Sequence, residues 1–370
     1  MAAVGSDLTV GFSYARYPSG QNCIDRRYSL TKVSIPVTLC PDGVYDEPLE
    51  ACRQTIACVS LGRRKMTCCI AALCDERESI ILVADRMVGT GMIEGEPDIK
   101  KVFALHKHWR VMLAGNDISP AFPIIDSVRQ KLTLHRGRLT VQHVMDAVYG
   151  SYRDEREVLA EAVHLAPRGW TTKRFNSPAA QIIPESLREV ISDSLHDQRL
   201  EVTLLVSGFD GFGKGHVFSV SDDYQTRGKP QRHDIPGFQA IGSGGPGAMY
   251  MMMYREVSPS MPLRLALYYA IEGKYFGEQA AAVGTDTDAY IMRAGENVFR
   301  IKLEVLNDYL FKLCEKLKPR DLNQSDIGRL NSLPGKLIRS VPKLQRVKEG
   351  KEWVIREESS GKAERADPSD

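Results

Sequence analysis

Two consecutive apolar runs constrain this chain more than any other feature of its sequence. "TCCIAALC" begins at Thr67 and "SIILVAD" ends at Asp85, and the polar string "DERE" separates them. Short apolar runs joined in this way are typical of two β-strands that form a hairpin. Because nearly every residue of both runs is apolar, we expect both faces of the hairpin to be covered by other parts of the protein.

Further strand pairs and helices follow in order. "KKVFAL" and "WRVMLAG" predict a second hairpin, and Ser119 is expected to cap a helix whose apolar residues fall on one face (Ala121, Ile124, Ile125, Val128 and Leu132). The remaining patterns predict a helix over 140–156, strands in "EVTLLVSGFD", "GHVFSV" and "FQAIGSGG", helices in "PGAMYMMMYREV", "PLRLALYYAIEGKYFG" and "EVLNDYLFKLCEKL", and a hairpin in "TDAYIM" and "NVFRI". Such an order predicts an α+β fold of stacked antiparallel sheets covered by helices.

Composition divides the chain into three parts. Residues 1–66 hold scattered Pro, Gly and Cys with no sustained helical or strand period, so we expect a poorly ordered extension. Residues 67–318 carry the regular patterns of one large domain, with a more polar insertion near 160–200. Residues 319–370 are highly charged and are predicted to be a disordered tail. The basic stretch of this tail has no aromatic residues between its charges, which argues against nucleic-acid binding. We expect either a solvated tail or a tail that contacts neighbouring subunits.

Bulk properties narrow the class of protein without identifying a partner. The formal net charge is +2, and no apolar run reaches the roughly 20 residues that cross a bilayer. The first residues also lack a signal-peptide pattern, so we expect a soluble cytoplasmic protein with no membrane partner. None of the eight cysteines forms a paired Cys-x-x-Cys motif, and we expect reduced thiols, no metal and no cofactor.

Five polar or glycine positions are candidates for chemistry, although each has an ordinary structural explanation. Thr67 could be a strand residue, Asp85 a turn residue, and Lys101 a solvated lysine at a strand end. Gly115 could mark a turn, and Ser243 lies in "GSGG", which could be a flexible loop. Their joint arrangement is more informative. Lys101 lies in "KKV" sixteen residues after Asp85, and Gly115 lies in "LAG" fourteen residues further.

This arrangement, together with "KLTLHRGRL" and "AIGSGGPGAM", resembles the proteasome β-type family of N-terminal-nucleophile hydrolases. It is most similar to the peptidase subunit of the bacterial ATP-dependent proteasome-like protease, over roughly residues 67–300. The resemblance implies a four-layer αββα sandwich, with two stacked antiparallel sheets flanked by helices. It also implies a threonine-type endopeptidase of intracellular protein breakdown, assembled as a homo-oligomeric ring and served by an ATPase unfoldase. The string "MYMMMY" is then either a subunit contact or a core helix.

The resemblance assigns a role to each candidate. The hydroxyl of Thr67 would be the nucleophile and its own α-amine the general base, with a reference pKa of about 7.7–8.0. The ammonium of Lys101 would lower the pKa of that amine, Asp85 would hold the lysine, and the N–H of Gly115 would face the oxyanion. Ser243 matches the accessory serine of the family. Leu113 would shape the substrate pocket and favour apolar side chains.

Two departures keep other functions open. The polar pair that family members often carry near the later helix-to-strand turn falls here on Ala280 and Val283. The loss of a hydroxyl at Val283 is compatible with a non-catalytic structural subunit on the same fold. A small-amide hydrolase is a third reading, because fold does not fix substrate.

The proposed chemistry needs a free amine on Thr67, which a peptide bond from Met66 blocks. The bacterial peptidase begins Met-Thr and loses its methionine to an aminopeptidase. We therefore expect translation to start at Met66, because "GRRK" just before it can be encoded by the purine run that a bacterial ribosome binds. The alternative is that residues 1–66 form a propeptide or a regulatory extension.

Overall fold

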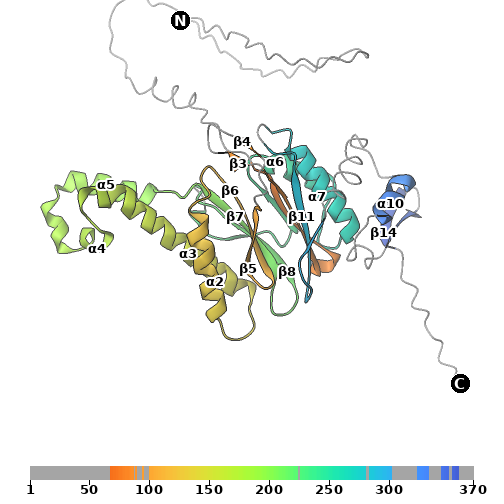
Figure 1. The fold of residues 1–370 in the computed structure, drawn as a ribbon, viewed down its shortest axis with the longest axis horizontal. Coiled ribbons are helices and arrows are strands. Elements are labelled where there is room, and N and C mark those ends of the chain that lie inside the picture. The colour runs from red at the N-terminus through yellow and green to blue at the C-terminus, as the bar shows by residue number, and fades with distance from the viewer. Residues whose placement is uncertain are drawn as a thin grey trace, which may run out of the picture. The chain divides into compact units, whose positions relative to one another are not determined.

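The computed structural model describes residues 67–86, 88–89, 94–95, 100–223, 226–280, 283–301, 323–332, 343–349 and 352–357. Over these residues the chain is a mixed α+β protein with two five-stranded antiparallel sheets and helices (Figure 1). The predicted extension over 1–66 and the predicted helix in "EVLNDYLFKLCEKL" lie outside the described residues.

The first sheet is built on the predicted hairpin. β1 (Cys69–Cys74) and β2 (Ser79–Asp85) pair antiparallel, so that Cys69 lies opposite Ala84. The sheet order is β10-β1-β2-β11-β12, in which β10 (Phe238–Ile241) and β12 (Phe299–Arg300) are the edge strands and β11 (Thr287–Arg293) lies between β2 and β12. Every residue of β1 and β2 is buried, which confirms that both faces of the hairpin are covered.

The second sheet has the order β5-β6-β7-β8-β9. Its strands are β5 (Val102–His106), β6 (Trp109–Gly115), β7 (Val202–Phe209), β8 (Gly215–Val220) and β9 (Gln231–Arg232). The pairing of β5 with β6 and of β7 with β8 matches the predicted strand pairs, whereas the short strand β9 was not predicted. A separate two-stranded ladder joins β3 (Val88–Gly89) to β4 (Glu94–Gly95).

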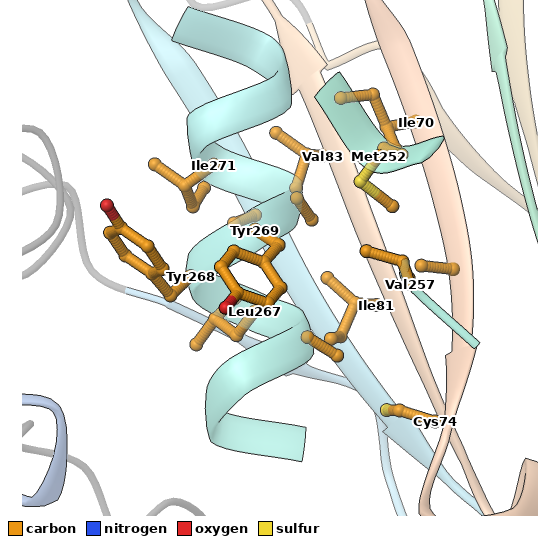
Figure 2. Close-up of a cluster of buried hydrophobic side chains, with 14 of the residues drawn as sticks. Ile70, Cys74, Ile81, Val83, Met252, Val257, Leu267, Tyr268, Tyr269 and Ile271 are labelled. Atoms are coloured by element: carbon orange, nitrogen blue, oxygen red, sulfur yellow. The ribbon is translucent and has the colours of Figure 1, made fainter. Parts of the chain in front are cut away.

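The two sheets pack face to face through one apolar cluster. Strand alternation sends Leu73 and Leu82 of the first sheet toward Met112 and Leu205 of the second. The opposite face of the first sheet packs on α6 (Gly245–Tyr254) and α7 (Leu263–Gly277). Figure 2 shows this contact, with side chains of β1 and β2 meeting those of α7 between the sheet and the helix.

Two other helices cover the second sheet. α2 (Ala121–Leu134) and α3 (Val141–Ala160) pack on its outer face, so the fold is consistent with a sandwich of two sheets between helices. The apolar face predicted for α2 is confirmed, since all five of its residues are buried. The predicted Ser119 cap is wrong. Pro120 occupies the N-cap position without a side-chain hydrogen bond, because Asp117 Oδ1 instead accepts from the Ser119 N–H at 2.9 Å and turns the chain into the helix.

Short helices fill the region where the sequence predicted an insertion. They are η2 (Glu161–Leu165), η3 (Ala166–Arg168), α4 (Thr172–Phe175), η4 (Pro178–Ile182) and α5 (Glu185–Asp197). Leu165, Phe175 and Ile191 form a small apolar cluster of their own. The excursion therefore carries its own core and leaves the strand order of the second sheet uninterrupted.

Part of the segment predicted to be a disordered tail is folded. It contains α10 (Gln324–Asn331) and a hairpin of β13 (Leu344–Glu349) and β14 (Glu352–Glu357). Ile327 and Leu330 are buried in the cluster that surrounds α7. High charge suggested a solvated chain, but apolar residues at helical spacing are enough to dock this helix.

Candidate active site

Three polar side chains predicted from the sequence meet at one end of the first sheet. Thr67 lies two residues before β1 and Asp85 ends β2, so antiparallel pairing brings them together. Lys101 immediately precedes β5. Its Nζ lies 3.0 Å from Thr67 Oγ1 and 2.9 Å from Asp85 Oδ1, so one ammonium joins the hydroxyl and the carboxylate.

The trio is almost fully withdrawn from solvent. Thr67 is 7% exposed, Asp85 1% and Lys101 6%. A buried carboxylate needs several donors, and Asp85 has them: its Oδ1 also accepts the N–H of Cys68 at 3.0 Å, and its Oδ2 accepts the N–H of Gly284 at 3.4 Å. These contacts fix the carboxylate, which in turn orients the lysine toward the threonine hydroxyl.

The glycine-rich loop wraps around the backbone of Thr67. The N–H of Gly244 donates to the Thr67 carbonyl at 3.2 Å. Gly242 adopts φ +88°, and a β-carbon there would lie 1.9 Å from the same carbonyl oxygen. Only glycine tolerates both this conformation and this approach. The close packing rules out a flexible loop and places Ser243 beside Thr67 in space.

The hydroxyl of Ser243 is not engaged by the other site residues. Its Oγ is buried and has no hydrogen-bond partner within the part of the chain that the structure describes. The backbone thus brings the predicted accessory serine to the site. Its hydroxyl takes no part in the hydrogen bonds that join Thr67, Lys101 and Asp85.

Gly115 and Leu113 lie at the end of β6. Val102 pairs with Met112, so the end of β6 lies beside the start of β5, where Lys101 is found. The Sγ of Cys69 also approaches the Leu113 carbonyl at 3.7 Å, which ties β6 to the start of β1. Gly115 packs tightly, since a β-carbon there would lie 2.3 Å from the Glu201 carbonyl oxygen.

The Leu113 side chain faces away from the sheet interface. It is 2% exposed and packs in the cluster beneath α2 and α3, whereas its neighbours Met112 and Ala114 face the other sheet. The structure therefore places Leu113 in the hydrophobic core, and its role in a substrate pocket stays a prediction.

Sequence reasoning missed a second buried lysine beside the site. Lys274 of α7 is 0% exposed, and its Nζ donates to the Gly284 carbonyl at 2.7 Å, the Thr285 carbonyl at 3.0 Å and the Glu278 carboxylate. The signal available in the sequence was a single lysine late in a mostly apolar helical pattern. Nothing in that pattern indicates which loop the lysine reaches.

Val283 and Cys68 complete the surroundings of the glycine-rich loop. A β-carbon on Gly244 would lie 3.1 Å from Val283 Cγ2 and 2.8 Å from Cys68 Cβ. Burial, reinforced by the negative charge of Asp85, raises the pKa of the Cys68 thiol to about 12. Because the thiolate is the nucleophilic form of cysteine, Cys68 is chemically inert near neutral pH. Thr67 carries the nucleophilic group best placed at this site.

No family model matches the chain, and no curated protein matches it. None of the helices among the described residues combines the length and apolarity needed to span a bilayer. The same residues contain no group of three His, Cys, Asp or Glu side chains placed to hold a metal ion.

Proposed function

We propose that the protein is a threonine-type peptidase of the proteasome-like N-terminal-nucleophile class, with Thr67 as the nucleophile once the residues before it are removed. One observation carries the proposal. A buried ammonium, that of Lys101, contacts both the Thr67 hydroxyl at 3.0 Å and the Asp85 carboxylate at 2.9 Å, at the start of the first strand of a sheet. A solvated lysine at a strand end would make neither contact.

The reaction divides amide hydrolysis into two acyl transfers. The free α-amine of Thr67 takes the proton from Oγ1 as the oxygen bonds to the substrate carbonyl carbon. The tetrahedral intermediate then collapses, and the resulting ammonium returns the proton to the leaving amine. Water, activated by the same amine, attacks the ester formed on Oγ1, which releases the acid and restores the hydroxyl.

The other site residues adjust this chemistry. The positive charge of Lys101 disfavours a second positive charge nearby, so it keeps the Thr67 amine in its neutral, basic form. Asp85 keeps Lys101 in place. The N–H of Gly115 is the proposed oxyanion donor, a contact whose loss typically costs about 10²–10³ in rate.

The fold type, assembly and partners that we propose are those of the same N-terminal-nucleophile class. We infer a four-layer αββα sandwich of the N-terminal-nucleophile type, a homo-oligomeric ring, protein or peptide substrates, and an ATPase that delivers unfolded chains. The apolar outer face of α6 supports assembly, since Tyr250 is 65% exposed, Met253 60% and Tyr254 56%. Contiguous apolar surface of this kind is typical of interfaces between proteins. Met251 and Met252 are buried, so the methionine-rich helix has both a core face and an exposed apolar face.

A non-catalytic subunit on the same fold is the second candidate. The apolar side chain of Val283 beside the glycine-rich loop favours it, as does the hydroxyl of Ser243, which has no hydrogen-bond partner among the described residues. Under this reading, the buried Lys101–Asp85 pair would only stabilise the end of the sheet.

Peptide hydrolysis separates these candidates. A chain that begins at Thr67 should cleave peptide amides with apolar side chains, and Thr67→Ala should lose at least about 10³-fold in kcat. Thr67→Ser keeps both hydroxyl and amine and should retain measurable activity. Equal rates of hydrolysis by the wild-type chain and by Thr67→Ala, or no hydrolysis by either, would rule out the proposal that the protein is an enzyme. Cleavage of small amides without cleavage of peptides would identify the small-amide hydrolase instead.

A further inference from the structure

We propose that Lys274 is a positioning residue for Asp85, acting from α7 through the loop at Gly284 and Thr285. The inference rests on the proposed function of Thr67. The hydrogen bonds of the site do not join Lys274 directly to Thr67 or Lys101. Lys274 acts on them through the backbone groups to which it donates.

The connection runs through one peptide unit and two hydrogen bonds. The Nζ of Lys274 donates to the Gly284 carbonyl at 2.7 Å. The N–H of the same glycine donates to Asp85 Oδ2 at 3.4 Å, and Asp85 Oδ1 accepts from Lys101 at 2.9 Å. The ammonium therefore fixes the segment that supplies a donor to the far oxygen of the carboxylate.

The energetics of burial explain why this clamp is rigid. An ammonium with 0% exposure loses its hydration, so it must keep all three of its donors occupied. Two of its acceptors are the Gly284 and Thr285 carbonyls. Any shift of that loop would leave a buried charge without its hydrogen-bond acceptors, which is strongly unfavourable. The loop is consequently held in one position, and its N–H with it.

The end of α7 also presses directly on the site. A β-carbon on Gly277 would lie 2.8 Å from the Gly244 carbonyl oxygen and 2.9 Å from Cys68 Sγ. Gly244 itself donates to Thr67. Lys274 thus lies one turn from a helix end that is in van der Waals contact with both segments flanking the nucleophile.

Arg264 provides a matched control on the same helix. It is 2% exposed, and its Nη1 donates to the Leu330 carbonyl at 3.0 Å in α10, away from the site. Replacing either cation with methionine removes a buried charge from α7. Arg264→Met frees the Leu330 carbonyl, whereas Lys274→Met frees the Gly284 and Thr285 carbonyls and leaves the Glu278 carboxylate without this cation. Only Lys274→Met also removes the support of Asp85.

The test compares wild type, Lys274→Met and Arg264→Met by hydrogen exchange of the Gly284 amide and by steady-state kinetics. Lys274→Met should exchange this amide at least about tenfold faster and lower kcat about 10–100-fold, with KM changed less than about threefold. Arg264→Met should lose thermal stability while its Gly284 exchange and its kcat remain within about threefold of wild type.

Two results would overturn the inference. One is an unchanged Gly284 exchange rate in Lys274→Met, and the other is the same loss of kcat in both variants, which would mark a general loss of stability. If wild type hydrolyses no amide at all, the proposed function fails, and the exchange rates alone then decide whether Lys274 holds the loop.

Discussion

The carbonyl oxygen of Thr67 lies where a side chain on Gly242 would begin, with only 1.9 Å between that oxygen and the position of a β-carbon. A loop far along the chain is therefore shaped to the backbone of Thr67, two residues before the first strand. The N–H of Gly244 completes the contact by donating to the same carbonyl. Such close backbone packing fixes the direction in which the Thr67 side chain leaves the sheet.

Gly242→Ala should consequently disable the site. Alanine would have to adopt φ +88° and would displace either the loop or Thr67, so we expect at least about a hundredfold loss of kcat and about 2–4 kcal/mol of stability. Gly137→Ala is the matched control, because Gly137 has φ +109° with nothing within 4 Å of its β-carbon position. It should lose only about 1 kcal/mol and keep full activity. Wild-type kinetics in Gly242→Ala would show that this packing does not position the nucleophile.

Removing Lys101 should affect stability and activity in separable ways. Lys101→Met leaves the carboxylate of Asp85 buried without its cation, and we expect a loss of about 3–5 kcal/mol in urea unfolding. Adding Asp85→Asn removes the uncompensated charge and should recover part of that stability. Neither protein should hydrolyse peptides, because both lack the ammonium beside Thr67. If the double variant recovered activity together with stability, the Lys101–Asp85 pair would have a purely structural role.

A buried hydrogen-bond network around His216 predicts how the stability of the fold changes in acid. Burial opposes ionisation of Asp234, but hydrogen bonds from His216, Arg232 and the Val217 N–H outweigh it and hold the pKa of this carboxyl well below its usual range. A carboxyl whose pKa is lowered by folding stabilises the fold above its unfolded pKa of about 3.9, and this contribution is lost as the pH falls below that value. Asp234→Asn should therefore be less stable at pH 6 and show a shallower loss of stability below pH 4. Parallel pH–stability curves for the two proteins would refute this role.

The buried thiol of Cys68 predicts how the stability of the fold changes in alkali. Folding raises the pKa of its thiol to about 12. In the unfolded chain the thiol loses its proton at a lower pH, so its contribution to the stability of the fold is fully present below the unfolded pKa and decreases as the pH rises above about 9. Between pH 9 and pH 10 the loss should approach about 1 kcal/mol. Cys68→Ala should lack this component, which urea unfolding at both pH values would measure as a smaller difference. An identical alkaline loss in Cys68→Ala would assign the effect to other groups.

Local sequence patterns were sufficient for much of the fold. The all-apolar strings of β1 and β2 predicted a covered hairpin, and the spacing of Ile124 and Val128 predicted the buried face of α2. Hairpin pairing of β1 and β2 accounts for the approach of Thr67 to Asp85. Lys101 precedes a strand of the other sheet, so its convergence with them followed only from the family resemblance and not from any local pattern.

Other features depend on contacts that no local pattern contains. The direction of Leu113 follows from which face of its sheet meets the other sheet, and strand alternation alone does not choose between the two faces. The clamp of Lys274 depends on a loop that approaches α7 only in the folded chain. The docking of α10 was hidden by the charge around it, since two buried residues, Ile327 and Leu330, suffice to anchor the helix.

The intact mass of the protein while it is hydrolysing peptides tests the role of Thr67 most directly. An N-terminal nucleophile needs a free amine, so the active chain should have the mass of a polypeptide whose first residue is Thr67. Chains that keep Met66 should be inactive. Full peptidase activity in a chain that retains Met66 would mean that the Thr67 amine is not the base, and the proposed mechanism would be wrong.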